Sequence, residues 1–358
     1  MGITGTIKYV QLLLVVLLVA AGCSRPAKLV TKEDAIAFAK EIELTINKRN
    51  SGFLDDAIDK KEFIKRMALP KTSDARGFGN GVMETLKLGS KIVETFNDGD
   101  KYTFIKCYET NHVYHIIFRF FREKDAGLNY QDFELVMAGD KCKIADGYMY
   151  STGEMLSETM HQMYFATLHN VGQEEEGLKK INEIKTLYQK GKSSEAKVIY
   201  NSLPQYLRKT KMVLLLNVYV SEGLSLAEYD EALKEFRDNF PNERSMNLMM
   251  IDGYYMHQDY VKMLAAVNAL DVQINKDPLL DYHRFLSYKL LGQKDSSILC
   301  IKRLLNNMPD FQRAYIENIS FELGKGNSVQ ADSLIAVYRK KPGFDQQRLN
   351  DIIDSNKK

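Results

Sequence analysis

The C-terminal half of the chain carries a repeat with a period near 34 residues, and no other feature of the sequence limits the fold as strongly. Five residues, at successive separations of 36, 31, 34 and 34, mark the same point of each unit: Ala196, Ala232, Met263, Ser297 and Ala331. Four positions after each stands a larger apolar residue, namely Tyr200, Phe236, Val267, Ile301 and Ile335. A spacing of four places both residues on one face of a helix. The repeat therefore predicts a helix with an apolar stripe in every unit.

A partner helix is expected before this one in each unit. Five residues before four of the marker positions lie Gly191, Gln258, Gly292 and Gly326. Glycine readily adopts the left-handed conformation that ends many helices, so these positions predict a turn between two helices. One proline per unit follows the second helix, where it prevents the helix from continuing: Pro204, Pro241, Pro278, Pro309 and Pro342.

This pattern resembles the tetratricopeptide repeat (TPR) over residues 178–342. It combines a small marker residue, an apolar residue four positions later, a proline at the end of the unit and a period near 34 residues. The resemblance implies four or five units of two antiparallel helices, stacked into an all-α superhelix over residues 178–345, with residues 346–358 as a tail. Three features depart from the family pattern: the chain has no tryptophan, Met263 and Ser297 replace the usual alanine, and the second unit has extra residues around 221–226. The alternative is an ordinary helical domain with an accidental period.

In a TPR stack the first helices line a concave groove that holds a peptide or a helix of another protein. Carrying the groove positions of the family onto this sequence gives five candidate partner-binding residues: Asp252, Tyr255, Tyr282, Lys289 and Arg313. The alternative for the two tyrosines is an ordinary core or surface role. The lysine and asparagine positions with which some TPR proteins clamp a terminal carboxylate are not evident, so the resemblance leaves the identity of the partner open.

The N-terminus carries an apolar run of ten residues, Leu12 to Ala21, which ends just before Cys23. A helix that crosses a bilayer needs about 20 apolar residues, so the run predicts a targeting segment over residues 1–22. Together with the small residues Ala20, Ala21 and Gly22 and with Cys23, this run resembles a bacterial lipoprotein signal. In that family leucine is usual at the position of Ala20. That resemblance implies that Cys23 becomes the lipid-bearing first residue; an ordinary signal peptide is the alternative.

A lipid anchor at Cys23 would place the mature protein in the cell envelope, since two or more acyl chains hold a protein durably on a membrane. Residues 24–26 after the cysteine contain no acidic residue of the kind that retains lipoproteins elsewhere. By the same resemblance, we expect an outer-membrane location facing the periplasm.

The charge balance limits the possible partners, and the cysteine content limits the possible disulfides. The chain has 49 basic and 47 acidic residues, and this balance gives no electrostatic footprint for nucleic acid. Cys107, Cys142 and Cys300 are scattered and odd in number, which does not indicate a disulfide framework, although a Cys107–Cys142 pair stays open.

Residues 31–170 are expected to form an α+β domain, joined by a linker of residues 23–30 to the signal peptide. Helices are predicted from Thr31, over 53–68, after a glycine-rich turn at 77–81, and over 154–170. At the first of them, Thr31 and Asp34 three residues later come close to a capping box. Four alternating segments, at 101–109, 112–121, 129–138 and 142–150, predict a four-stranded antiparallel meander. Helices packed on such a meander resemble the NTF2-like or cystatin-like folds, and this resemblance is one of arrangement.

Four polar residues of these strands form a candidate pocket. His115 and Arg119 share one face of their strand, and Asp132 and Glu134 share one face of the next. If the two faces coincide, the four groups can shift one another's pKa values, as acid–base catalysis requires. The alternative is an ordinary solvated face with cross-strand ion pairs.

Taken together, the sequence predicts a non-catalytic envelope lipoprotein that binds or assembles other proteins. No HExxH, paired CxxC, EF-hand or GxSxG motif is present, so no catalytic, cofactor-binding or metal-binding residues are assigned. The alternative is a small-ligand-binding protein or an enzyme with its site in the sheet pocket. Glycan capture is disfavoured because sugar sites favour tryptophan, which is absent.

Overall fold

The computed structural model describes residues 28–123, 127–168, 173–241 and 243–356. The predicted signal peptide, residues 1–22, and the predicted lipid anchor, Cys23, lie outside these ranges. So does the stretch 169–172, which contains part of the predicted boundary between the two halves of the chain. None of the helices in the described part of the chain combines the length and the apolar character that a membrane span requires.

From residue 28 on, the N-terminal part begins with five helices: α2 (Lys32–Asn47), α3 (Gly52–Asp55), α4 (Lys60–Arg66), α5 (Ser73–Thr85) and α6 (Leu88–Glu94). Helix α2 begins at the predicted capping box. The Asp34 backbone N–H donates to Thr31 Oγ1 (3.1 Å), and the Thr31 backbone N–H donates to Asp34 Oδ2 (3.3 Å). These two bonds satisfy amides that have no partner inside the helix.

Two predictions for this part of the chain are wrong. The helix expected over 53–68 is divided into α3 and α4, because the chain between them hydrogen bonds to a strand: Ile144 donates to the Ala57 carbonyl and Asp59 donates to the Ile144 carbonyl, both at 2.8 Å. The glycine-rich turn expected at 77–81 lies inside α5. That helix is capped by Thr72, and its Gly79 packs closely on Met67.

A five-stranded antiparallel sheet follows, with strand order β1-β2-β3-β4-β5. Its strands are β1 (Lys101–Thr110), β2 (Val113–Phe121), β3 (Leu128–Ala138), β4 (Lys141–Met149) and β5 (Glu154–Met155). The first four match the predicted meander, and the two-residue β5 is additional. Bulges interrupt the pairing at Phe104/Lys106 and at Glu134/Leu135, where local twist increases. The chain therefore has an α+β N-terminal part, as predicted.

The rest of the described chain is helical. After α7 (Leu156–Leu168) come α8 (Gln173–Gln189), α9 (Ser193–Asn201), α10 (Gln205–Arg208), α11 (Lys211–Glu222), α12 (Leu226–Asn239), α13 (Met246–Met256), α14 (Tyr260–Gln273), α15 (Leu280–Leu290), α16 (Lys294–Asn307), α17 (Gln312–Gly324), α18 (Ser328–Tyr338) and α19 (Gln346–Ser355). Successive helices pack in pairs, α8 with α9, α11 with α12, α13 with α14, α15 with α16, and α17 with α18. We call this series of pairs the helical array.

The marker residues of the repeat explain how each pair packs. All five are at most 3% exposed on the second helix of their pair, because a small or flexible side chain there lets the first helix approach closely: Ala196, Ala232, Met263, Ser297 and Ala331. The turn between the paired helices is left-handed at the four predicted positions, with φ between 57° and 73° at Gly191, Gln258, Gly292 and Gly326. The sequence prediction of helix pairs is confirmed in this respect.

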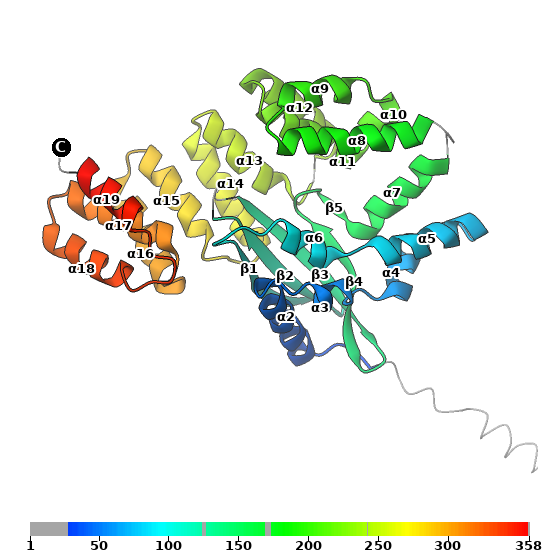
Figure 1. Cartoon of the computed structure of the whole chain (residues 1–358), viewed down its shortest axis with the longest axis horizontal. Helices are drawn as coiled ribbons and strands as arrows, with labels where there is room; N and C mark the ends of the chain where they lie inside the picture. The colour runs from blue at the N-terminus through cyan, green and yellow to red at the C-terminus, as the bar shows by residue number, and fades with distance from the viewer. Residues whose placement is uncertain (1–27, 124–126, 169–172, 242, 357–358) are drawn as a thin grey trace, which may run out of the picture.

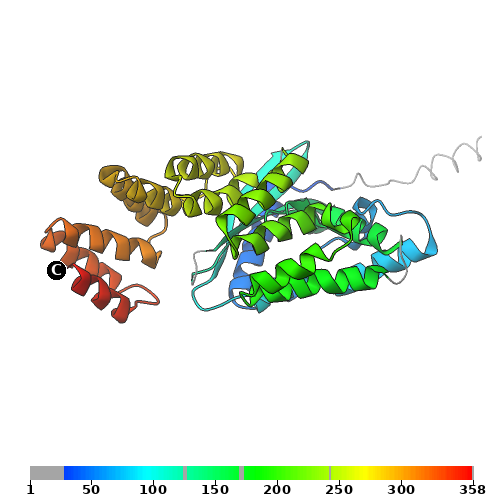
Figure 2. The ribbon, with the colours of Figure 1, turned by 90° about the horizontal axis from the view of Figure 1, so that it is seen from above.

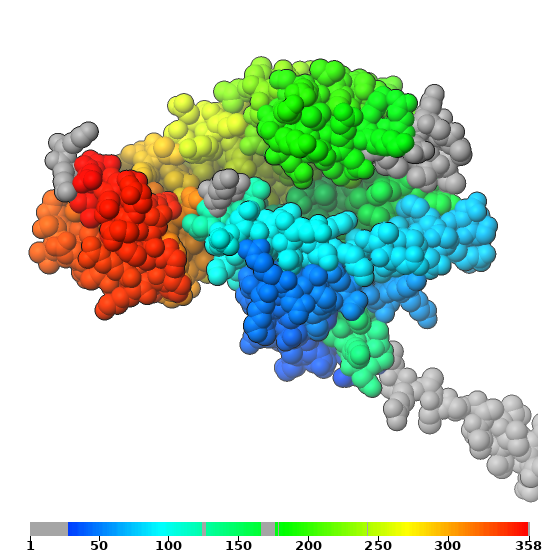
Figure 3. All heavy atoms as spheres, in the orientation of Figure 1, coloured from blue at the N-terminus to red at the C-terminus, as the bar shows by residue number. Residues whose placement is uncertain are grey.

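The sheet lies between the N-terminal helices and the helical array (Figure 1). One face, with Ile116, Phe118 and Phe133, forms a core with α2. The opposite face, with Tyr130 and Tyr150, forms a core with residues of α13, α14 and α15. The array runs along this second face, and α15–α19 project beyond the sheet (Figures 1 and 2). In the space-filling view the two parts of the chain lie against each other over a long boundary (Figure 3).

Candidate functional site

The face of the sheet that meets the helical array contains the four predicted pocket residues. The pairing register places His115 opposite Glu134 and Arg119 opposite Tyr130, while Asp132 pairs with Ile117 between them. Cross-strand partners project to the same face, so the side chains share one surface as the sequence suggests. The four side chains, however, do not all bond to one another.

His115 and Asp132 form the centre of a buried polar cluster, which we call the sheet cluster. His115 Nδ1 lies 3.1 Å from Asp132 Oδ1, and Tyr108 Oη donates to Asp132 Oδ2 at 2.6 Å. Arg244, from the connection between α12 and α13, donates to the same oxygen at 2.7 Å. The ring of Tyr108 also stacks on His115 with centroids 4.8 Å apart.

The sheet cluster is electrostatically satisfied. Asp132 is 1% exposed, and such burial raises a carboxyl pKa; hydrogen bonds from His115, Tyr108 and Arg244 outweigh it and hold the pKa of Asp132 below its usual value. The guanidinium of Arg244 also lies over the ring of Tyr148, with its carbon 4.3 Å from the ring centroid. A carboxylate with three donors already in place joins the sheet to the array and has little capacity left to accept a substrate proton.

The other two predicted pocket residues are directed elsewhere. Arg119 pairs with Asp277, in the connection between α14 and α15, and both side chains are nearly fully buried. Glu134 pairs with Arg66 of α4. The structure therefore joins His115 to Asp132, whereas Arg119 and Glu134 each form an ion pair with a residue of another element.

The five predicted groove residues also divide into two groups. Asp252 and Tyr255 of α13 and Lys289 of α15 are exposed, and Lys289 pairs with Glu317 at 2.8 Å. Tyr282 is 5% exposed, and its ring packs on Phe311 with centroids 5.5 Å apart.

Arg313, the last of the five, donates to Glu123, which lies two residues after the end of β2. At this end of the array Phe121 of β2 packs against Phe311, with ring centroids 5.5 Å apart. The sheet of the same chain thus occupies the surface at Tyr282 and Arg313. The sequence could not show this, because the contacting residues lie some 190 positions apart.

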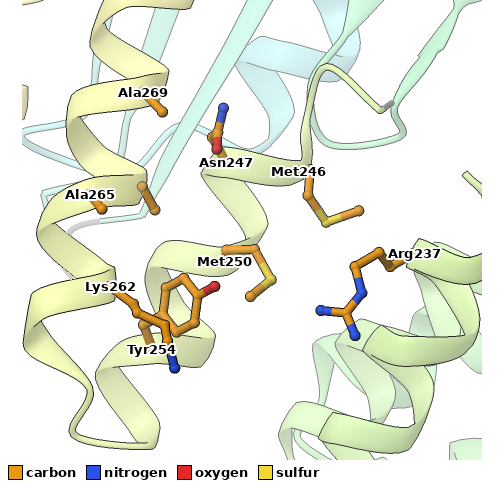
Figure 4. A pocket seen from close by; sticks show the side chains of 9 residues that line it. Arg237, Met246, Asn247, Met250, Tyr254, Lys262, Ala265 and Ala269 are labelled. Atoms are coloured by element: carbon orange, nitrogen blue, oxygen red, sulfur yellow. The ribbon is translucent and has the colours of Figure 1, made fainter. Parts of the chain in front are cut away.

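An open groove remains between α12 on one side and α13 and α14 on the other (Figure 4). We call it the α12–α14 groove; its volume is about 350 Å³. Its floor is apolar and flexible, formed by Met246 and Met250 of α13 and by Ala265 and Ala269 of α14. Methionine side chains adapt to differently shaped apolar partners. Figure 4 shows them facing the side chain of Arg237 across the groove.

The edges of the α12–α14 groove are basic. Arg237 of α12 is exposed and, among the described residues, makes no hydrogen bond or ion pair. Lys262 of α14 pairs with Asp259 at 2.6 Å and lies 5.8 Å from the ring centroid of Tyr254. An apolar floor between two cations suits an apolar segment that carries a negative charge. Sequence reasoning missed the groove, although Met246 and Met250 at a spacing of four gave a weak signal.

Neither a metal site nor a reactive cysteine is evident among the described residues. They contain no group of three or more His, Cys, Asp and Glu side chains with a metal-binding arrangement. Cys107 and Cys142, whose pairing the sequence left open, are free thiols, as is Cys300. Burial raises the pKa of the Cys142 thiol to about 12, so it is protonated at neutral pH.

Comparisons with known proteins add no assignment: no family model, no curated protein and no solved structure matches this chain.

Proposed function

We propose that this protein is a lipid-anchored binding module of the cell envelope, whose TPR-like helix pairs hold a partner protein in the α12–α14 groove. The observation that carries the proposal is the groove itself, an apolar floor of methionine and alanine side chains between Arg237 and Lys262. The regular helix pairs support a TPR-like array, because each pair contacts the next pair along the chain.

The partner is proposed to present an amphipathic helix or peptide with an acidic flank. Its apolar residues would cover the methionine and alanine floor, and its carboxylates would approach Arg237 and Lys262. Charge pairs at the rim of such an interface mainly raise the rate of association.

The N-terminal α+β part, proposed to be NTF2-like or cystatin-like, supports the array from within. Three successive connections between helix pairs contact residues of the sheet, through Arg244, Asp277 and Phe311. These contacts would fix the curvature of the array and with it the width of the groove. An enzyme site on the same sheet face is less well supported, because the acidic group of the sheet cluster is already fully hydrogen bonded.

The groove can be tested in the full chain with two substitutions on one helix. Ala269 is exposed on the groove floor, whereas Val272 is 78% exposed on α14 outside the groove. Ala269→Glu places a carboxylate among apolar side chains, and Val272→Glu adds the same charge elsewhere. Proteins captured from solubilised membranes by the wild type and by Val272→Glu, but lost with Ala269→Glu, would support the proposal. Identical capture by all three proteins would refute it.

The proposed anchor needs its own test. Cys23→Ser removes the thiol that a lipid would modify, so the variant should move from the membrane fraction to the soluble fraction. Globomycin, which blocks lipoprotein signal cleavage, should cause the uncleaved wild-type precursor to accumulate. Unchanged fractionation of the variant and unchanged processing with globomycin would contradict anchoring through Cys23.

A further inference from the structure

A second cavity lies between the sheet and the end of the helical array, away from the α12–α14 groove. Its volume is about 500 Å³, and we call it the β1–β2 cavity. One wall is formed by β1, β2 and the residues that flank them, and the other by the α16–α17 and α18–α19 connections. It therefore depends on both halves of the chain.

Three hydrogen-bond donors gather at the sheet wall of this cavity. Lys101 and Thr103 stand two positions apart on β1 and share a face, and Arg119 of β2 is the cross-strand partner of Thr103. Arg119 Nη2 lies 3.4 Å from Thr103 Oγ1. An ammonium, a hydroxyl and a guanidinium are thus adjacent on one surface, which is the donor set that recognises a carboxylate.

The local charges leave one positive charge in excess at this donor set, that of Lys101, because Asp277 compensates the charge of Arg119. The two acidic residues that line the cavity are each neutralised from outside it, Glu123 by Arg313 (3.0 Å) and Asp310 by Lys341 (3.1 Å). Lys101 has no ion-pair partner in the part of the chain that the structure describes.

The side chain of Arg119 gives a second, independent indication that the cavity binds an anion. It is 3% exposed, and its charge is met by Asp277, but its Nε–H is buried without a hydrogen-bond partner. Leaving a buried donor unpaired is costly, and native proteins generally avoid it. A small shift of this side chain toward a bound anion would satisfy the orphaned donor.

The cavity also has an apolar surface that spans its two walls. Phe121 of β2 and Phe311 of the opposite wall pack with ring centroids 5.5 Å apart, and Met308, Pro309 and Pro342 extend this surface on the opposite wall. A ligand that fits both walls must combine one anionic group with an apolar body. Its size is limited to that of a small molecule, since about 500 Å³ lies in the usual range of roughly 300–1,000 Å³ for ligand pockets.

We infer that the β1–β2 cavity binds a small amphipathic carboxylate. The carboxylate accepts from Lys101, Thr103 and Arg119, and the apolar body lies against Phe121 and Phe311. Because the cavity is built from both halves of the chain, the bound ligand stabilises the contact between the sheet and the last helix pairs. This site is separate from the proposed partner groove and does not depend on it.

Decanoate, used below its micelle concentration, is a suitable probe, with 1-decanol and decylamine as neutral and cationic counterparts of the same length. Titration calorimetry on the full-length chain without its signal peptide should show decanoate binding that is at least about tenfold tighter than that of either counterpart, because charge-assisted hydrogen bonds hold only the anion. Bound decanoate should also raise the melting temperature, since it binds the folded state.

Substitutions locate the site. Lys101 is exposed, so Lys101→Ala should fold normally and weaken decanoate binding at least about tenfold. Lys106→Ala, on the same strand outside the cavity lining, should leave binding unchanged, and so should Ala269→Glu in the α12–α14 groove. Absence of binding, equal binding of decanoate and 1-decanol, or equal binding by wild type and Lys101→Ala would each overturn the inference.

Discussion

The guanidinium of Arg119 on β2 pairs with the carboxylate of Asp277, which lies 158 positions later in the chain, between α14 and α15. Tyr130 of β3 donates to the same carboxylate at 2.7 Å, and so does the Leu279 backbone N–H at 3.0 Å. Asp277 is 2% exposed and Arg119 3%. This buried ion pair joins the sheet to the helical array.

Removal of one member of this pair should be strongly destabilising. Asp277→Ala leaves the charge of Arg119 buried and uncompensated, and we expect a loss of about 3–5 kcal/mol in the free energy of unfolding. Urea denaturation followed by circular dichroism measures it. Asp310→Ala, which breaks an exposed pair with Lys341, is the control and should cost less than about 1 kcal/mol. If both variants lose a similar amount of free energy of unfolding, the buried pair does not hold the sheet and the helical array together.

The pH dependence of stability should reveal the sheet cluster. The pKa of Asp132 is held below its usual 3.8 by its donors, so the ionised form stabilises the folded state above that pH. This stabilisation should be lost progressively as the pH falls through 3.8 toward the lower folded value. Asp132→Asn cannot titrate, and its stability should change less with pH over the same interval. Parallel pH profiles for wild type and variant would contradict the geometry of the cluster.

A second pH effect should come from the array. Burial lowers the pKa of His283 on α15 to about 4, from 6.5, because the charged ring is poorly solvated there. Between these values the unfolded chain binds a proton and the folded chain does not, so stability should fall by up to roughly 3 kcal/mol as the pH drops from 7 to 4. His283→Gln removes this titration. A variant whose stability has the same slope between pH 4 and 7 as the wild type would show that His283 is accessible to protons.

Substitution of two glycines of α5 should increase stability. A Cβ atom added at Gly77 or Gly81 would meet nothing within 4 Å, so alanine should gain helix propensity at no steric cost. We expect each substitution to stabilise the protein by about 0.5–1 kcal/mol, measured from the urea midpoint. At Gly79 the added atom would lie 3.4 Å from Met67, so the gain there should be smaller. Destabilisation at Gly77 and Gly81 would indicate that this segment is the turn that its sequence suggests.

Local features of the fold could be predicted because short-range patterns determine them. The capping box at Thr31, the strands and the left-handed turns at Gly191 and Gly326 all depend on residues within a few positions. The run of glycines at 77–81 misled the prediction, because glycine is common in turns and the packing of Gly79 on Met67 is invisible in sequence.

The surroundings of the candidate site residues were harder to predict, for a physical reason. Alternation along a strand correctly placed His115 and Arg119 on one face but could not identify what covers that face. Arg244 and Asp277, which contact it, lie in connections where isolated charged residues are ordinary. Tyr282 was a reasonable groove residue in an isolated array, and it is buried beside Phe311 because the sheet fills that surface. Long-range contacts of this kind decide which predicted surfaces stay open.

The central claim, that the α12–α14 groove holds a partner protein, is tested most directly by site-specific photocrosslinking in living cells. A photoreactive amino acid at Ala269 lies on the groove floor, and one at Val272, three residues later, lies outside it. A partner in the groove should give a discrete crosslinked product from position 269 that is absent from position 272 and lost when Met250→Glu is added. No product at position 269, or the same product from both positions, would contradict it.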